Sequence, residues 1–115
     1  MNIIFAGTPQ FSADHLKILL DSQHKVKCIL TQPDRGSGRG KKVKPSPVKE
    51  MGLDNGIEIL QPSSLKDESI IRSLESVEPD LMLVVAYGLL IPKKVLGIAE
   101  KGCINIHASI LPRWR

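Results

Sequence analysis

Residues 81–86 narrow the possible folds of this chain more than any other segment, because all six of their side chains are apolar. A strand with one face in water alternates polar and apolar side chains, whereas a strand covered on both faces is apolar throughout. The unbroken apolar run is therefore typical of a strand buried inside a parallel sheet. We predict that residues 81–86 form the central strand of such a sheet and that helices cover both of its faces.

Shorter apolar segments on either side of this run complete the pattern of a parallel α/β domain. Composition and turn signals predict strands at residues 2–6, 26–31, 57–60, 81–86 and 103–107. Apolar residues at helical spacing predict helices over residues 9–22, 47–56, 70–77 and 92–99. Strands that alternate with helices in this way are typical of an α/β fold with a Rossmann-like, mostly parallel sheet and flanking helices.

Two of the predicted helices begin with a capping signal. We expect Thr8 to cap the first helix, with Pro9 at its first position, where proline is best tolerated. In the same way, we expect Ser46 to cap the helix over residues 47–56, with Pro47 at its first position. These signals set the expected amino ends of both helices.

Ligands of parallel α/β sheets bind beyond the carboxyl ends of the strands, where the strand order reverses. The loops at that edge are residues 7–9, 87–92 and 108–115. Residues 7–9 contain neither a G-x-G-x-x-G motif nor a P-loop motif, so we interpret them as a close-packed turn rather than a phosphate-binding loop. We expect the functional site to lie among these loops.

Asn105 and His107 form a polar pair at the carboxyl end of the last predicted strand. Alternate side chains of a strand share a face, so the two project together while Ile104 and Ile106 face the opposite side. An amide N–H of Asn105 can stabilise an oxyanion, and an imidazole can move a proton near neutral pH. The pair therefore suits attack of an amine on a carbonyl, although an isolated Asn-x-His is more often only the solvated end of a strand.

The net charge of +4 comes from one part of the chain. Residues 35–49, called the basic segment below, hold six basic side chains and no acidic one, whereas the remaining residues hold ten basic and twelve acidic ones. Such asymmetry indicates a polyanionic partner. Glycines predict a mobile loop, and the scarcity of aromatic side chains predicts contacts with phosphates rather than with bases. The alternative is a charged loop that meets only solvent.

The cysteines and the apolar segments are those of an intracellular protein. Cys28 and Cys103 lie inside predicted strands, so we expect small buried hydrophobic side chains rather than a disulfide or a metal site. No apolar run reaches the roughly 18–20 residues that cross a bilayer, and no leader pattern follows Met1. We therefore expect a cytoplasmic protein without a membrane partner.

Residues 102–115 closely resemble the signature of the folate-dependent formyltransferases; they read Gly-Cys-Ile-Asn-Ile-His-Ala-Ser-Ile-Leu-Pro-Arg-Trp-Arg. Five earlier segments, in order, resemble the branch of that family that acts on methionyl-tRNA. They are Ile-Phe-Ala-Gly-Thr-Pro at 4–9, Thr-Gln-Pro-Asp-Arg at 31–35, Gly-Arg-Gly-Lys-Lys at 38–42, Pro-Ser-Pro-Val-Lys at 45–49 and Val-Val-Ala-Tyr-Gly at 84–88. The resemblance covers essentially the whole chain.

The resemblance implies transfer of a formyl group from 10-formyltetrahydrofolate to the amino group of initiator methionyl-tRNA, without a metal. The family uses an Asn, a His and an Asp. Asn105 and His107 match the first two, and the aspartate is expected after Arg115.

The resemblance also assigns the folate contacts. Residues 109–112 match the tetrahydrofolate-contacting segment, with Ile110 in place of the usual leucine, and residues 87–91 resemble the other wall of the pterin pocket. The residues are Ser109, Ile110, Leu111, Pro112, Tyr87, Gly88, Leu89, Leu90 and Ile91. For residues 87–91 the alternative is a hydrophobic turn that packs on the core.

By the same resemblance, the basic segment contacts the acceptor arm of the tRNA. The side chains assigned to that contact are Arg35, Arg39, Lys41, Lys42 and Lys44. Relatives that act on sugar nucleotides or on glycinamide ribonucleotide look shorter and less basic here. Two alternatives remain: a formyltransferase for a small amine such as a sugar nucleotide, and a non-catalytic α/β domain that binds RNA.

The resemblance implies that residues 1–115 are the amino-terminal part of a catalytic domain. The rest of that domain and a carboxyl-terminal barrel domain are expected after Arg115. We expect the full-length protein to be monomeric and the 115-residue segment alone to be inactive.

Overall fold

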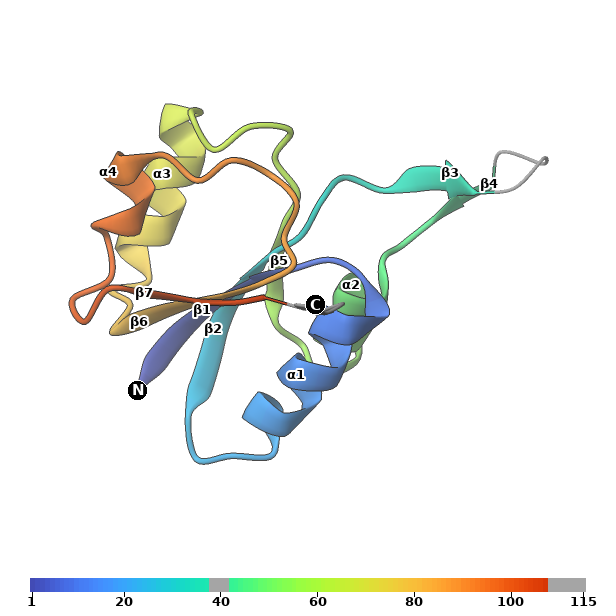
Figure 1. Ribbon diagram of the computed structural model, residues 1–115, viewed down its shortest axis with the longest axis horizontal. Coiled ribbons are helices and arrows are strands. Elements are labelled where there is room, and N and C mark those ends of the chain that lie inside the picture. Colours follow the sequence, from blue (N-terminus) through green and yellow to red (C-terminus); the bar gives the residue numbers. More distant parts are fainter. Residues whose placement is uncertain (38–41, 108–115) are drawn as a thin grey trace, which may run out of the picture.

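The computed structural model describes residues 1–37 and 42–107, and its main element is a five-stranded parallel sheet (Figure 1). Its strands are β1 Asn2–Gly7, β2 Lys25–Leu30, β5 Glu58–Leu60, β6 Leu81–Val85 and β7 Cys103–Ile106. The helices are α1 Gln10–Leu20, α2 Pro47–Asp54, α3 Glu68–Ser76 and α4 Lys93–Leu96. The predicted fold class, a mostly parallel α/β sheet with flanking helices, is confirmed.

The strands lie in the order β5-β2-β1-β6-β7, so β1 and not β6 is the central strand. Our placement of residues 81–86 at the centre is therefore wrong, although β6 is an interior strand with β1 on one side and β7 on the other. The error arises because β1 is equally apolar from Ile3 to Ala6 and buried as far as Gly7. Apolarity thus marks β1 and β6 as interior strands but does not show which of the two lies at the centre.

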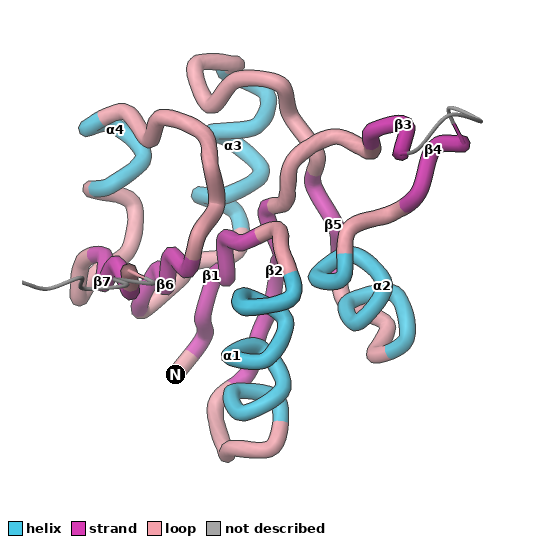
Figure 2. Tube along the Cα trace, turned by 45° about the vertical axis from the view of Figure 1, so that its right-hand side comes forward, coloured by secondary structure: helices cyan, strands magenta, loops and turns pink. Residues whose placement is uncertain are grey.

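Helices cover both faces of the sheet, and the two faces follow the alternation of side chains along each strand. In β1 and β6, odd-numbered residues such as Phe5 and Val85 pack against α1 and α2. Even-numbered residues of these two strands, such as Ile4 and Val84, pack against α3 and α4. Figure 2 shows α1 and α2 on one side of the sheet and α3 and α4 on the other. The predicted coverage of both faces is confirmed.

The strand order reverses between β1 and β6. The chain moves outward from β1 to β2 and β5, then returns to the other side of β1 to form β6 and β7. The carboxyl ends of β1 and β6 therefore flank the position at which parallel α/β domains bind their ligands.

The amino ends of the helices agree only in part with the capping prediction. Ser46 caps α2 as expected, since its hydroxyl accepts a hydrogen bond from the backbone N–H of Lys49 at 3.0 Å. For α1 the prediction is wrong: Pro9, not Thr8, is the capping residue, and no side chain caps this helix. The hydroxyl of Thr8 instead donates to the backbone carbonyl of Tyr87 at 3.0 Å. A contact between strand ends has thus taken the place of a local cap.

The last helix is shorter than predicted. Residues 92–99 were expected to be helical, but α4 ends at Leu96 and Gly97 follows it as the capping residue. Glycine is the least favourable residue in a helix interior apart from proline, which explains the early end.

The basic segment contains secondary structure that the sequence did not predict. Strand β3 (Arg35–Ser37) pairs in antiparallel fashion with β4 (Lys42–Lys44), and this pair is called the basic hairpin below. Arg35 lies opposite Lys44. Figure 1 shows the hairpin extending away from the sheet and its helices. The expectation of a loop throughout is wrong for these two strands, and residues 38–41 lie outside the described residues.

None of the helices formed by residues 1–37 and 42–107 has the length and apolarity needed to span a membrane.

Candidate active site

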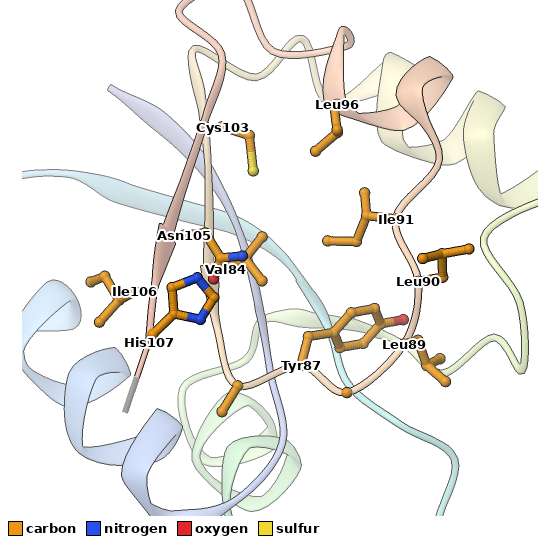
Figure 3. Close-up of a pocket in the computed structure, with 12 residues that line it drawn as sticks. Val84, Tyr87, Leu89, Leu90, Ile91, Leu96, Cys103, Asn105, Ile106 and His107 are labelled. Carbon is orange, nitrogen blue, oxygen red and sulfur yellow. The ribbon is translucent and has the colours of Figure 1, made fainter. Parts of the chain in front are cut away.

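A cavity of about 770 Å³ opens at the carboxyl ends of β6 and β7, on the side of the sheet that carries α3 and α4 (Figure 3). We call it the first cavity. It is lined by Val84, Ala86, Tyr87, Gly88, Leu89, Leu90, Ile91, Leu96, Cys103, Asn105, Ile106 and His107. Its volume falls within the range typical of small-molecule sites. Residues of the predicted catalytic pair and all five residues of the predicted folate turn thus meet at one cavity.

Asn105 and His107 extend from the end of β7 on the same side and into the first cavity (Figure 3). Ile106 points the other way and packs against the cluster that includes α1. The predicted sharing of a face is therefore confirmed. Both polar residues are exposed, so their side chains are accessible to a ligand.

The opposite wall of the first cavity is the turn that follows β6. The backbone conformation of this turn is unusual. Ala86 has φ +51° and Gly88 has φ +92°, so two of three successive residues are left-handed. Such conformations are costly for residues other than glycine and persist only where the surroundings hold them. A Cβ added at Gly88 would also collide with the side-chain amide of Gln32. The backbone therefore favours glycine at position 88, and any side chain there would also have to displace the Gln32 amide.

Hydrogen bonds from two other strand ends hold this turn. The backbone carbonyl of Tyr87 accepts from the hydroxyl of Thr8 at 3.0 Å and from Nε2 of Gln32 at 2.9 Å. Gly7, at the end of β1, lies so close to β6 that an added Cβ would be 2.7 Å from the carbonyl oxygen of Val85. The close packing expected of residues 7–9 is confirmed for Gly7 and Thr8, whereas Pro9 is exposed.

Tyr87 contributes an apolar ring to the wall rather than an acid or base. Its side chain is only 2% exposed, and burial raises the pKa of its hydroxyl to about 12. The phenol is therefore neutral near pH 7. Its oxygen has no hydrogen-bond partner within the described part of the chain.

The remaining residues of the turn are apolar, and Ile91 points from it toward the polar pair (Figure 3). Leu90 is 81% exposed, whereas Leu89 and Ile91 are partly buried and pack against the core. Leu90 therefore adds little to the core, and it lines the first cavity. The alternative reading of this turn, as core packing alone, fits Leu89 and Ile91 but not Leu90.

Five residues that line the first cavity were not assigned to the site from the sequence: Val84, Ala86, Leu96, Cys103 and Ile106. Cys103 precedes Asn105 by two positions, so the alternation that paired Asn105 with His107 could also have identified it. Burial raises the pKa of the Cys103 thiol, which disfavours a reactive thiolate. Leu96 carries no such signal, because its position depends on how α4 folds back over the sheet.

The other cysteine agrees with its prediction. Cys28 is fully buried in β2, and burial together with the nearby Glu58 carboxylate raises the pKa of its thiol to about 12. Cys28 and Cys103 are both free thiols. Among the described residues, no group of three or more His, Cys, Asp or Glu side chains is placed to bind a metal ion.

A second cavity, of about 560 Å³, lies at the base of the basic hairpin. It is lined by Thr8, Pro9, Gln32, Pro33, Asp34, Arg35, Lys44, Pro45, Ser46, Pro47 and Ala86. Ala86 lines both cavities, so they adjoin at the left-handed turn. The exposed Arg35 and Lys44 are thus directed toward the same edge of the sheet as the first cavity.

An ion pair fixes the base of the hairpin. Nζ of Lys49 lies 2.7 Å from a carboxylate oxygen of Asp34, and Nε2 of Gln61 donates to the other oxygen at 2.7 Å. The hydrogen bonds from Lys49 and Gln61 lower the pKa of Asp34 below its ordinary value. Lys49 is therefore engaged within the protein and less available to a partner than Arg35 or Lys44.

Several predicted site residues fall outside what the structure describes. Ser109, Ile110, Leu111 and Pro112 follow the last described residue, and Arg39 and Lys41 lie between the two described ranges. Lys42 has a described backbone position in β4.

The fold and the first cavity define a parallel α/β domain with a cavity at the carboxyl ends of β6 and β7, next to the point where the strand order reverses. The family model "Formyl transferase" matches residues 1–115, and the chain belongs to that family.

Curated relatives match along the whole chain. Methionyl-tRNA formyltransferase of Pseudomonas fluorescens (strain Pf0-1) is 55% identical over 115 residues, which are 100% of this chain and 36% of that protein. Methionyl-tRNA formyltransferase of Marinobacter nauticus is 56% identical over 115 residues, which are 100% of this chain and 37% of that protein. The chain therefore spans little more than a third of the length of these relatives.

A solved structure shows the same fold. Phosphoribosylglycinamide formyltransferase from Bacillus halodurans superposes with a TM-score of 0.69 over 97% of this chain and 58% of that one. The sequence identity is 15%, so this similarity bears on the fold alone.

Proposed function

We propose that the full-length protein transfers a formyl group from 10-formyltetrahydrofolate to the amino group of initiator methionyl-tRNA. The observation that carries the proposal is the convergence of Asn105 and His107 with the 87–91 turn on one cavity. The identity of 55% with a methionyl-tRNA formyltransferase supports the choice of acceptor.

The first cavity fits the donor by size and by the chemistry of its walls. Leu90 and Ile91 offer apolar surface for a flat heteroaromatic ring, and the turn offers backbone groups for its polar edge. Residues 109–112 supply a further wall by resemblance to the family. When bound, the folate supplies the formyl carbon that the amine attacks.

Asn105 and His107 then have distinct roles. An amide N–H of Asn105 donates to the formyl oxygen and stabilises the negative charge that develops there. The imidazole of His107 accepts the proton that the attacking amine loses. The bond from the formyl carbon to the methionyl nitrogen forms, the bond to N10 of the folate breaks, and the proton passes to N10. The third member of the family's set, an aspartate, lies after Arg115 in this proposal.

The basic hairpin is assigned to the tRNA. Arg35 and Lys44 are exposed on adjacent strands beside the second cavity. They form a cationic surface for backbone phosphates, to which Arg39, Lys41 and Lys42 are added by resemblance. We place the full-length protein in the cytoplasm as a monomer.

The proposal is tested by formylation assays on the full-length protein with methionyl-tRNA and with small amines, including a sugar nucleotide. We expect formylation of methionyl-tRNA, at a rate lowered at least about 100-fold by His107→Ala and by Asn105→Ala. The control is Lys101→Ala, an exposed lysine outside both cavities. Formylation only of the small amine, or full activity in His107→Ala, would contradict the proposal.

A further inference from the structure

Gln32 connects the basic hairpin to the turn that walls the first cavity. Its Nε2 donates to the carbonyl oxygen of Tyr87 at 2.9 Å, and its Oε1 accepts from a guanidinium nitrogen of Arg35 at 2.6 Å. Tyr87 lines the first cavity, whereas Arg35 begins the basic hairpin and lines the second. One side-chain amide therefore joins groups from the two parts of the site.

The chemistry of its partners fixes the orientation of this amide. A backbone carbonyl can only accept a hydrogen bond, and a guanidinium can only donate. The amide nitrogen must therefore face Tyr87, and the oxygen must face Arg35. The backbone of Gln32 is held as well, since its N–H donates to Thr8 at 3.3 Å and its carbonyl accepts from Gln61 at 3.2 Å.

The turn that contains Ala86 and Tyr87 needs the support of the hydrogen bond from Gln32. Ala86 is left-handed at φ +51°, a conformation that an alanine keeps only when its surroundings hold it. The carbonyl of Tyr87 is the acceptor through which Thr8 and Gln32 hold the turn. The amide of Gln32 also lies against Gly88, where it would overlap an added Cβ. A shift of this amide would therefore change the wall of the first cavity.

We propose that Gln32 is a positioning residue through which Arg35 of the basic hairpin sets the shape of the first cavity. The inference rests on the proposed function, because it takes the first cavity as the folate site. Arg35 is not among the described residues that line that cavity, so it acts on a bound folate only through Gln32. Removing Arg35 weakens folate binding even when no RNA is present.

The test is a double-mutant cycle on the full-length protein. The dissociation constant of a tetrahydrofolate analogue is measured without RNA for the unaltered protein, Gln32→Met, Arg35→Met and the double variant. Methionine matches the length of the glutamine side chain and replaces the aliphatic stem of arginine, so both substitutions remove the polar groups. We expect each single substitution to weaken binding about threefold to tenfold, the effect of one hydrogen bond. In the Gln32→Met background, Arg35→Met has no further effect, because its route to the turn is already lost.

Two further variants separate this role from general destabilisation. Arg72→Met makes the same change at an exposed arginine of α3 outside both cavities and leaves folate affinity unchanged. Gln32→Glu keeps an acceptor for Arg35 but loses the donor for Tyr87, so it weakens folate binding as Gln32→Met does. Thermal unfolding of every variant is also measured, because a variant that folds poorly would show both a lower affinity for the folate analogue and a lower midpoint temperature of unfolding.

The outcomes distinguish this inference from the proposed function. An unaltered protein that does not bind the analogue contradicts the proposed function, and with it the inference. An unaltered protein that binds, together with an Arg35→Met variant of equal affinity, overturns the inference alone. Effects of Arg35→Met and Gln32→Met that simply add also overturn it, because Arg35 would then act by another route. Arg35 is exposed, so its variant remains informative even if Gln32→Met folds poorly.

Discussion

At the scale of single residues, the site depends on positions where the backbone leaves few choices. Gly88 combines a φ of +92° with an amide packed against its Cα, and Gly7 lies too close to Val85 to carry a side chain. These glycines bring the ends of β1, β2 and β6 together, because they let the strand ends approach and the chain turn sharply. The first cavity owes its shape to this close approach.

We predict that Gly88→Ala lowers the free energy of unfolding more than Gly56→Ala does. Gly56 is also left-handed, at φ +67°, but no atom lies within 4 Å of an added Cβ, so this control isolates the backbone cost. That cost is about 1–2 kcal/mol. At Gly88 the new methyl group also displaces Gln32 from Tyr87 and removes a hydrogen bond worth about 0.5–1.5 kcal/mol. Urea unfolding of both variants measures the difference, and equal losses would contradict this account of the turn.

The alternation of side chains along a strand was enough to predict that Asn105 and His107 share a face. The same alternation also places Cys103 on that face. It could not reveal Gln32, because glutamine is common on loops and its partners, Arg35 and Tyr87, are set by the tertiary fold. The left-handed conformation of Ala86 could not be predicted from the sequence for the same reason. Such a conformation reflects the forces of neighbouring strand ends rather than a local preference.

At the scale of elements, helix starts show where local signals hold and where they are overridden. Ser46 caps α2 and also lies 2.9 Å from the hydroxyl of Thr31 at the end of β2. Local capping and packing against the sheet agree there, so the sequence signal was reliable. Thr8 has the same local signal, but its hydroxyl reaches the Tyr87 carbonyl instead. The β3 and β4 strands were missed because Gly36 in β3 and the two lysines of β4 have no strand preference.

We expect Ser46→Ala to destabilise the protein by about 1–2 kcal/mol, because it leaves the amino end of α2 without its cap. Thr31 loses its hydroxyl partner in the same variant. Chemical denaturation is the measurement, and Ser76→Ala, at an exposed position at the end of α3, is the control with little effect. A Ser46→Ala variant as stable as Ser76→Ala would mean that the cap contributes nothing.

The ion pair at the base of the basic hairpin predicts a dependence of stability on pH. The pKa of Asp34 is lowered in the folded protein, so its contribution to stability is present above the ordinary aspartate pKa and is lost as the pH falls through the folded value. Asp34→Asn lacks this contribution at every pH. We therefore expect the unaltered protein to be the more stable of the two near pH 7 and the difference to shrink on acidification below about pH 4. Urea midpoints across this range test the prediction, and a constant difference would contradict it.

At the scale of the whole molecule, strand order brings together segments that are far apart in the sequence. Thr8, Gln32 and Tyr87 meet because β1, β2 and β6 are parallel and end at one edge. The alternation of strands and helices predicted the parallel sheet, and apolar runs predicted its buried strands. The exact order could not be predicted in this way, since β1 and β6 are both apolar and either could stand at the centre.

The claim on which the account depends is that residues 87–91, Asn105 and His107 form a single folate site. The most direct measurement is a crystal structure of the full-length protein with a bound tetrahydrofolate analogue. We predict the pterin ring against Leu90 and Ile91, with N10 of the folate turned toward Asn105 and His107. An analogue bound in the second cavity, or bound with N10 turned away from Asn105 and His107, would contradict the account.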